Sequence, residues 1–174
     1  SPASRRVAGL PDEIVPDRLR GAMQGSIIET SPASVAILRA VAKLLTTQGG
    51  AALIIDYGYD GPALGDTLQA VKGHGYANPF EAPGEQDLTA HVDFATLSAM
   101  AQLTGATVHG PVGQGAWLEA LGIGPRAQWL AQTNPARAND VEAARWRLTA
   151  PEEMGTLFRA MALTGKDWEK PEGF

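Results

Sequence analysis

GGAALIIDYGY, at residues 49–59, is the stretch that decides the fold of this 174-residue chain. Two glycines end a preceding helix, and five apolar residues (51–55) then follow with no polar residue between them. Such an uninterrupted run predicts a strand that is buried on both faces, as in a parallel sheet covered by helices. Ligands of these sheets bind beyond the carboxyl ends of the strands. We therefore expect Asp56 and Tyr57 at a binding crevice.

Helical and strand-like segments alternate on either side of this run. Ser31 and Pro32 predict the start of one helix, and Asp93 is the expected N-cap of another, which ends at Gly105. A strand, three short helices and a closing strand are expected further on, at residues 106–114, 115–121, 125–132, 140–148 and 156–164. This order predicts an α/β fold with a twisted, mostly parallel, doubly wound sheet. Three main strands are too few for a whole domain, so residues 1–174 are expected to form half of one.

Two stretches lack helical or strand periodicity. Residues 1–25 are interrupted by proline and glycine and are interpreted as a loop-like connection. Residues 58–88 are also rich in glycine and proline, but they contain tyrosine, phenylalanine and histidine, which argue against disorder. Long irregular segments in compact domains are usually functional. The second stretch is therefore predicted to be a long ordered loop over the strand end.

Composition excludes several functional classes. A formal net charge of −5 and a pI near 5.1 argue against a nucleic-acid surface, which is usually basic. The chain has no cysteine, and its three histidines match no zinc-binding spacing, so no metal is expected. No apolar run approaches the roughly 20 residues of a membrane helix. We predict no membrane insertion.

Several motifs, in a fixed order, carry a resemblance to a known family. ETSP (29–32), ALIIDYGY (52–59), GDTLQA (65–70), DLTAHVDF (87–94) and MGTLFRAMALT (154–164) are the main ones. Together they resemble the carboxyl-terminal half of the MidA family of class I S-adenosylmethionine-dependent methyltransferases. The resemblance implies a Rossmann-like sheet in which residues 51–57 form the fifth strand. Residues 156–164 would form an antiparallel last strand near the same edge.

The resemblance also implies a function. The cofactor would be S-adenosylmethionine and the acceptor a protein arginine, with a respiratory complex I subunit as one candidate substrate. The compartment would be the cytoplasm of a bacterium or the mitochondrial matrix of a eukaryote. Two alternatives stay open: a non-catalytic assembly or interaction module that keeps the fold, and a methyltransferase that acts on a small molecule.

The family's cofactor-binding segments have no counterpart in this chain. No glycine-rich loop follows an early strand, and the nearest candidate, GPVGQG (110–115), lies between a late strand and a short helix. Cofactor-binding residues therefore stay unassigned. We expect the chain alone to be inactive.

Asp56, His91 and Asp93 are the predicted catalytic residues. An acceptor guanidinium stays protonated at neutral pH, so carboxylates must hold it and assist proton removal. Asp56 follows the buried strand; its alternative role is to cap the next turn through backbone N–H groups. Asp93 could orient His91 as a base, but it is also the expected helix cap.

Six residues form the predicted substrate-binding set. Tyr57 could line the acceptor pocket or simply pack, and Gly58 follows it at the same corner. Three loop residues, Asp66, Thr67 and Gln69, could order this segment over the substrate. The alternative role of Asp66 is to cap a local turn. His74 could contact the acceptor or be solvated.

Overall fold

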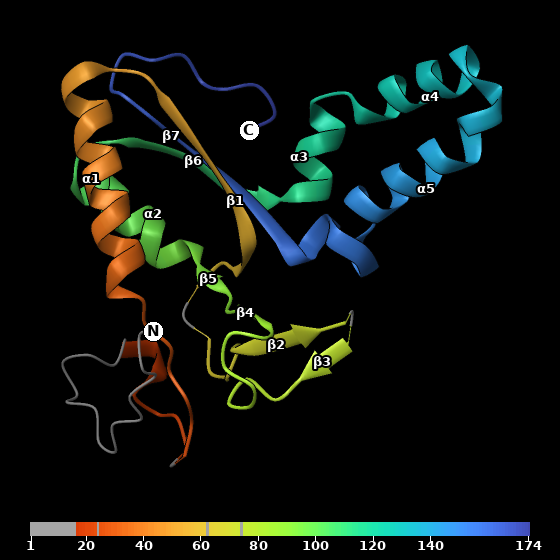
Figure 1. Cartoon of the computed structure of the whole chain (residues 1–174). Coiled ribbons are helices and arrows are strands. Elements are labelled where there is room, and N and C mark those ends of the chain that lie inside the picture. The colour runs from red at the N-terminus through yellow and green to blue at the C-terminus, as the bar shows by residue number, and fades with distance from the viewer. Residues whose placement is uncertain (1–16, 24, 62, 74) are drawn as a thin grey trace.

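A four-stranded sheet with the order β5-β1-β7-β6 forms the centre of the computed structural model (Figure 1). Its strands are β1 (Ala51–Tyr59), β5 (Val92–Asp93), β6 (Thr107–Gly113) and β7 (Phe158–Thr164). The structure describes residues 17–23, 25–61, 63–73 and 75–174. His74 and most of the predicted connection at residues 1–25 lie outside this part. A short 3₁₀ helix, Asp17–Leu19, precedes the first α-helix.

Strand directions confirm the predicted fold class. β1 pairs in parallel with β5 at Gly58 and Val92, and antiparallel with β7 along its length, from Ala51 opposite Thr164 to Tyr57 opposite Phe158. β6 is also antiparallel to β7. β5, β1 and β6 therefore run one way, and β7 runs the other way between two of them. This is the mostly parallel sheet with an inserted antiparallel last strand that the family resemblance implies.

Helices α1 (Pro32–Gln48) and α2 (Phe94–Leu103) cover one face of the sheet. The hydroxyl of Ser31 caps α1 as predicted, and proline occupies its first turn. The core comprises buried residues from both helices, from β7 and from the position just before β6: Leu38, Ala42, Leu45, Phe94, Leu97, Ala101, Ala106, Met161 and Leu163. Ala52 and Ile54 pack against this core from β1.

The opposite face of β1 is open, so the prediction of burial on both faces is wrong for the described residues. Leu53 is 51% exposed and Ile55 is 40% exposed. Side chains alternate along a strand, and both helices pack on the side of Ala52 and Ile54. The edge of β1 is also open before Gly58, since β5 pairs only with its last two residues.

The excursion after β1 contains a second sheet, which corrects the prediction of one long loop over residues 58–88. Strands β2 (Gln69–Lys72), β3 (Gly75–Ala77) and β4 (Asp87–Thr89) form an antiparallel sheet in the order β3-β2-β4. Alternation is recognisable over about four to eight residues, and these strands have three or four residues each. The small sheet lies below the carboxyl ends of β1 and β5 in Figure 1.

Three helices form an arm that extends to the side of the main sheet (Figure 1). They are α3 (Gln114–Ala120), α4 (Ile123–Thr133) and α5 (Ala138–Thr149). A short 3₁₀ helix, Pro135–Arg137, joins α4 to α5, and a single helical turn, Pro151–Gly155, leads from α5 toward β7. No helix in the described ranges has both the length and the apolar character to cross a membrane.

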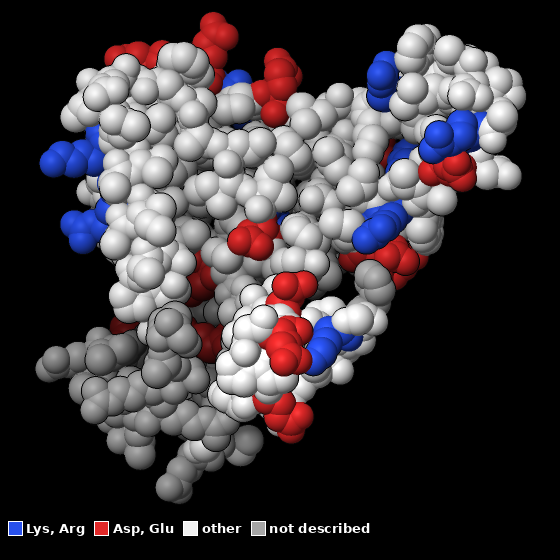
Figure 2. Space-filling model, viewed as in Figure 1, with Lys and Arg blue, Asp and Glu red and all other residues white. Residues whose placement is uncertain are grey.

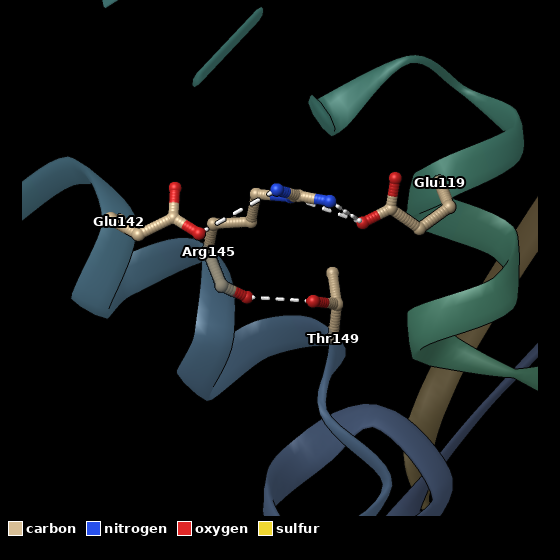
Figure 3. A network of polar contacts seen from close by, with 4 residues as sticks. All are labelled: Glu119, Glu142, Arg145 and Thr149. Atoms are coloured by element: carbon tan, nitrogen blue, oxygen red, sulfur yellow. Dashed lines mark hydrogen bonds and ion pairs between the residues drawn. The ribbon is translucent and has the colours of Figure 1, made fainter. Parts of the chain in front are cut away.

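An arginine ties the arm together (Figure 3). Arg145 on α5 donates from Nε and Nη2 to one carboxylate oxygen of Glu119 on α3, at 3.1 and 2.9 Å. Glu142 lies 3.6 Å from the same guanidinium, and the Thr149 hydroxyl donates to the Arg145 carbonyl oxygen. The hydrogen bonds to Glu119 raise the pKa of the Arg145 guanidinium above its ordinary value. This pairing fixes α5 against α3.

Candidate functional site

Three rings gather at the carboxyl end of β1. The rings of Tyr57 and Phe158 have centroids 4.0 Å apart, and the imidazole of His91 is stacked with the Tyr57 ring at a centroid distance of 6.3 Å. Phe158 lies directly opposite Tyr57 in the antiparallel register, so the two form a cross-strand pair. The structure thus brings together two predicted residues. Phe158 is a third residue of this site that the sequence did not indicate, because its position opposite Tyr57 depends on how β1 and β7 pair.

A hydrogen-bonded chain fixes three segments next to these rings. Thr67 donates its backbone N–H to Oε1 of Glu29, at 3.0 Å, and its hydroxyl to Oε2. The backbone N–H of His91 donates to the Thr67 hydroxyl oxygen, at 2.9 Å. Thr67 therefore orders the loop, in line with one role predicted for it. Glu29 was missed because its partner is 38 residues away in sequence.

Tyr59 has two carboxylates in its surroundings. Burial raises the pKa of its phenol, and the negative charges of Asp93 and Glu29 raise it further. Both effects disfavour the phenolate. An acidic environment of this kind favours a bound cation, and carboxylates bind guanidinium groups with charge-assisted hydrogen bonds. The carboxyl end of β1 thus combines aromatic rings with negative charge.

Asp93 serves as the N-cap of α2. Its Oδ1 accepts the backbone N–H of Thr96 at 3.1 Å, and its Oδ2 accepts the Thr96 hydroxyl at 2.7 Å. Each carboxylate oxygen therefore accepts one hydrogen bond within the helix cap. The His91 ring instead stacks on Tyr57. The geometry shows the capping alternative for Asp93, and its orientation of His91 stays a hypothesis.

Asp56 lies apart from this cluster. Side chains alternate along β1, so Asp56 and Tyr57 project from opposite faces of the strand. Oδ1 of Asp56 accepts the backbone N–H of Tyr57 at 2.8 Å, which is the local capping role. Arg159 is its register partner on β7, and the Nε atom of Arg159 is buried without a hydrogen-bond partner. A catalytic role for Asp56 stays a proposal.

The remaining predicted residues have local structural roles. A Cβ added to Gly58 would lie 2.5 Å from the Val92 carbonyl oxygen and 2.6 Å from the Phe94 ring, so only glycine allows β1 and β5 to approach this closely. Asp66 accepts the Leu68 N–H at 3.2 Å, as in the predicted turn cap. Gln69 is the first residue of β2.

Among the described residues, two of the pockets lie away from this cluster. One, of about 480 Å³, is formed by α5 and the turn after it and is lined by Trp146 and Glu153 among others. The other, of about 220 Å³, lies where Trp117 and Phe174 face the start of β1. Neither is lined by a predicted site residue. Across the described ranges, no group of three or more histidine, aspartate and glutamate side chains is arranged to hold a metal.

The GPVGQG segment (110–115), which lies within the described residues, does not form a cofactor cradle. The glycines of GPVGQG pack against the protein backbone: a Cβ at Gly113 would lie 2.9 Å from the Gly155 carbonyl oxygen, and one at Gly115 would lie 2.2 Å from that of Thr149. They permit close packing of β6 and α3 on the turn before β7. The space that a phosphate or nucleoside would need is filled by the chain itself.

Comparison with known proteins gives consistent results. Residues 4–112 match a family described as "Putative S-adenosyl-L-methionine-dependent methyltransferase". The mitochondrial protein arginine methyltransferase NDUFAF7 of Danio rerio is 38% identical over 133 residues, which are 76% of this chain and 31% of that protein. The NDUFAF7 homologue of Caenorhabditis elegans is 32% identical over 156 residues, 90% of this chain and 36% of that protein. The chain spans about a third of the length of these relatives.

Two crystal structures from Burkholderia thailandensis share the fold. One is of an uncharacterized protein, with a TM-score of 0.76 and 29% identity; the match covers 83% of this chain and 40% of the B. thailandensis chain. The other is a member of the same superfamily bound to S-adenosyl-homocysteine, with a TM-score of 0.72 and 28% identity. This match covers 83% of this chain and 38% of the B. thailandensis chain.

Proposed function

This chain belongs to the family of S-adenosyl-L-methionine-dependent methyltransferases that its residues 4–112 match, and from this premise we propose that the whole protein methylates an arginine side chain of another protein. The family predicted from the sequence motifs is confirmed, as is the fold class. One observation carries the proposal: the NDUFAF7 relatives, similar over most of this chain, are protein arginine methyltransferases by name. S-adenosyl-homocysteine in the second B. thailandensis structure supports the cofactor.

This chain forms, in our proposal, the carboxyl-terminal half of a single methyltransferase domain. The open edge of β1 and the exposed Leu53 and Ile55 support this, since a central strand that is apolar on both faces is stable only when another layer covers it. The coverage of about a third of each relative also supports it. The remaining part of the domain would supply the adjacent strands and bind the cofactor.

The part assigned to this chain is to hold the acceptor arginine. A guanidinium is protonated at neutral pH and pairs with carboxylates through two parallel hydrogen bonds. Glu29 and Asp93 are near Tyr59 at the carboxyl end of β1, and Tyr57, His91 and Phe158 provide an aromatic wall. His91 is the candidate base. Asp56 is the alternative acid on the other face of the strand.

The expected partner is a protein substrate, and a respiratory complex I subunit is one candidate. The relatives in Danio rerio and Homo sapiens are mitochondrial by name, and the crystal structures come from a bacterium. We therefore expect the mitochondrial matrix if the source is a eukaryote and the cytoplasm if it is a bacterium.

Labelled methyl transfer in the whole protein tests the proposal. Calorimetry should detect S-adenosylmethionine binding, and label should pass to arginine in an arginine-containing protein mixture. His91→Ala and Glu29→Gln should each lower transfer at least tenfold while cofactor binding is retained. Glu152→Gln, an exposed residue in the turn before β7, is the matched control and should keep full activity.

Two results would contradict this function. If the whole protein neither binds S-adenosylmethionine nor transfers label, the alternative of a non-catalytic assembly module is favoured. If label passes only to small molecules, the acceptor assignment fails. Retained activity in both His91→Ala and Asp56→Ala would show that the residue assignments are wrong.

A further inference from the structure

Thr67 joins three segments of the chain that are far apart in sequence. Its hydroxyl donates to Oε2 of Glu29 and accepts the backbone N–H of His91 at 2.9 Å, and its own N–H donates to Oε1 of Glu29 at 3.0 Å. Glu29 is 38 residues away along the chain and His91 is 24 residues away. A hydroxyl can donate one hydrogen bond and accept others. A single, partly buried side chain thus links a carboxylate to a backbone amide.

The Glu29 side of this junction is anchored by the start of α1. Ser31, two residues after Glu29, is the N-cap of that helix. The backbone N–H of Gly65 donates to the Ile27 carbonyl oxygen at 3.0 Å, so the segment before α1 lies beside the segment that contains Thr67. Glu29 is therefore held by its own segment and by the Thr67 backbone, independently of His91.

The His91 side of the junction lies at the base of the small sheet, because Thr67 precedes β2 by two residues and His91 follows β4 by two. In Figure 2 the small sheet is the part below the main sheet that carries several acidic side chains. His91 lies between β4 and β5, outside both strands, so its bond to Thr67 holds its backbone. Its ring plane is 11° from that of Tyr57, a stacked geometry that aromatic pairs prefer. A shift of the His91 backbone would separate the two rings.

We propose that Thr67 is a positioning residue for the acceptor site and that its hydroxyl acts mainly through His91. This inference rests on the proposed function, in which His91 is the candidate base. If the hydroxyl is removed, Glu29 keeps its bond to the Thr67 N–H, whereas the His91 N–H loses its acceptor. A partly buried N–H without an acceptor is unfavourable, so the His91 segment would move and carry the imidazole away from Tyr57. Misplacement by about 1 Å can lower a rate about 100-fold.

Labelled methyl transfer by the whole protein to an arginine-containing protein mixture tests the role of the hydroxyl. Thr67→Val removes it at nearly constant shape, Thr67→Ala removes it from a smaller side chain, and Thr67→Ser retains it. The matched control is Thr133→Val, which removes a hydroxyl that donates to the Trp129 carbonyl oxygen at the end of α4, outside the site. Calorimetry gives the fraction of each variant that binds S-adenosylmethionine, so that rates refer to folded protein.

Thr67→Val and Thr67→Ala should each lower the initial rate about tenfold, while Thr67→Ser and Thr133→Val stay within about twofold of the wild-type rate. A loss in Thr67→Ser as large as in Thr67→Val would overturn the inference, since the methyl group rather than the hydroxyl would then matter. Wild-type rates in both Thr67→Val and Thr67→Ala would overturn it as well.

A double-mutant cycle separates positioning from general support of the fold. Changes that act through a shared partner are not additive. Thr67→Val should therefore lower the rate less than about twofold in a protein that already carries His91→Ala. A tenfold loss in both backgrounds would show that Thr67 acts on another group, and the inference would be wrong.

NMR of the whole protein follows His91 without catalysis and distinguishes this inference from the proposed function. The ring protons of His91, assigned by comparison with His91→Ala, should be shifted by the ring current of Tyr57. This shift should decrease in Thr67→Val and persist in Thr67→Ser. Unchanged His91 signals in Thr67→Val would overturn the positioning and leave the proposed function intact. A decreased shift in a protein whose wild type transfers no label would support the hold of Thr67 on His91 and overturn the proposed function.

Discussion

Replacing Gly58 with alanine tests the packing that brings β1, β5 and α2 together. The added Cβ would lie 2.5 Å from the Val92 carbonyl oxygen and 2.6 Å from two ring carbons of Phe94, whereas ordinary Cβ contacts begin at 3.4 Å. Strand and ring must therefore separate by about 1 Å. Phe94 is fully buried in the core, so it cannot rotate into solvent to relieve the contact.

Overpacking of this kind costs about 1–3 kcal/mol, and we expect the upper half of that range because backbone and ring are both obstructed. At an m-value of about 2 kcal/mol/M in urea, a loss of about 2 kcal/mol lowers the unfolding midpoint by about 1 M. Four tryptophans provide the fluorescence signal. The matched control is Gly75→Ala in β3, where the nearest atom to an added Cβ is the Lys72 carbonyl oxygen at 3.8 Å.

The comparison of these two variants has a clear negative outcome. If Gly58→Ala and Gly75→Ala unfold at the same urea concentration, β1 and β5 do not approach as closely as the structure shows. The explanation of Gly58 as a packing residue would then be wrong. A direct role in substrate binding, as predicted from the sequence, would gain support if such a variant lost activity without losing stability.

Three further predictions concern the core, a helix cap and a histidine. Phe94→Ala should lower the free energy of unfolding by about 3–5 kcal/mol, because it removes a fully buried ring; a loss below about 1 kcal/mol in thermal unfolding would show that the ring is not in the core. Asp93→Ala should cost about 1 kcal/mol through loss of the α2 cap, and Asp93→Asn, which can still accept the Thr96 N–H, should restore most of it in the same urea titration. Burial, aided by Lys170, holds the pKa of His109 below its ordinary 6.5. Its contribution to stability is therefore fully present above pH 6.5 and decreases as the pH falls through 6.5 toward the lowered value; His109→Gln should flatten this dependence, and an unchanged pH profile would contradict the assignment.

Much of the main sheet could be predicted from local sequence. The unbroken apolar run of residues 51–55 and the glycines before it identified β1. The Ser31–Pro32 and Asp93 patterns identified the starts of α1 and α2, because caps satisfy backbone N–H groups through side chains only a few residues away. The order of motifs identified the family and therefore an antiparallel last strand near the edge of β1; the structure places this strand, β7, between β1 and β6.

Other features depended on contacts between distant residues. The strands of the small sheet are too short for their alternation to be recognised, so only pairing across the turns defines them. Glu29 joins the site through a partner 38 residues away, and Phe158 joins through its register with Tyr57. The open face at Leu53 could not be predicted either, because the apolar run is the same whether one face or both are covered.

The sequence by itself thus determined the elements whose signals are local: helix caps, the apolar strand β1, and the motifs of a methyltransferase family. Only the tertiary structure decided which side chains meet at the carboxyl end of β1, and on which side of the strand each lies. The physical reason is that a cap or an apolar run acts over a few residues, whereas a site is assembled by hydrogen bonds and ring contacts that form after the strands have paired.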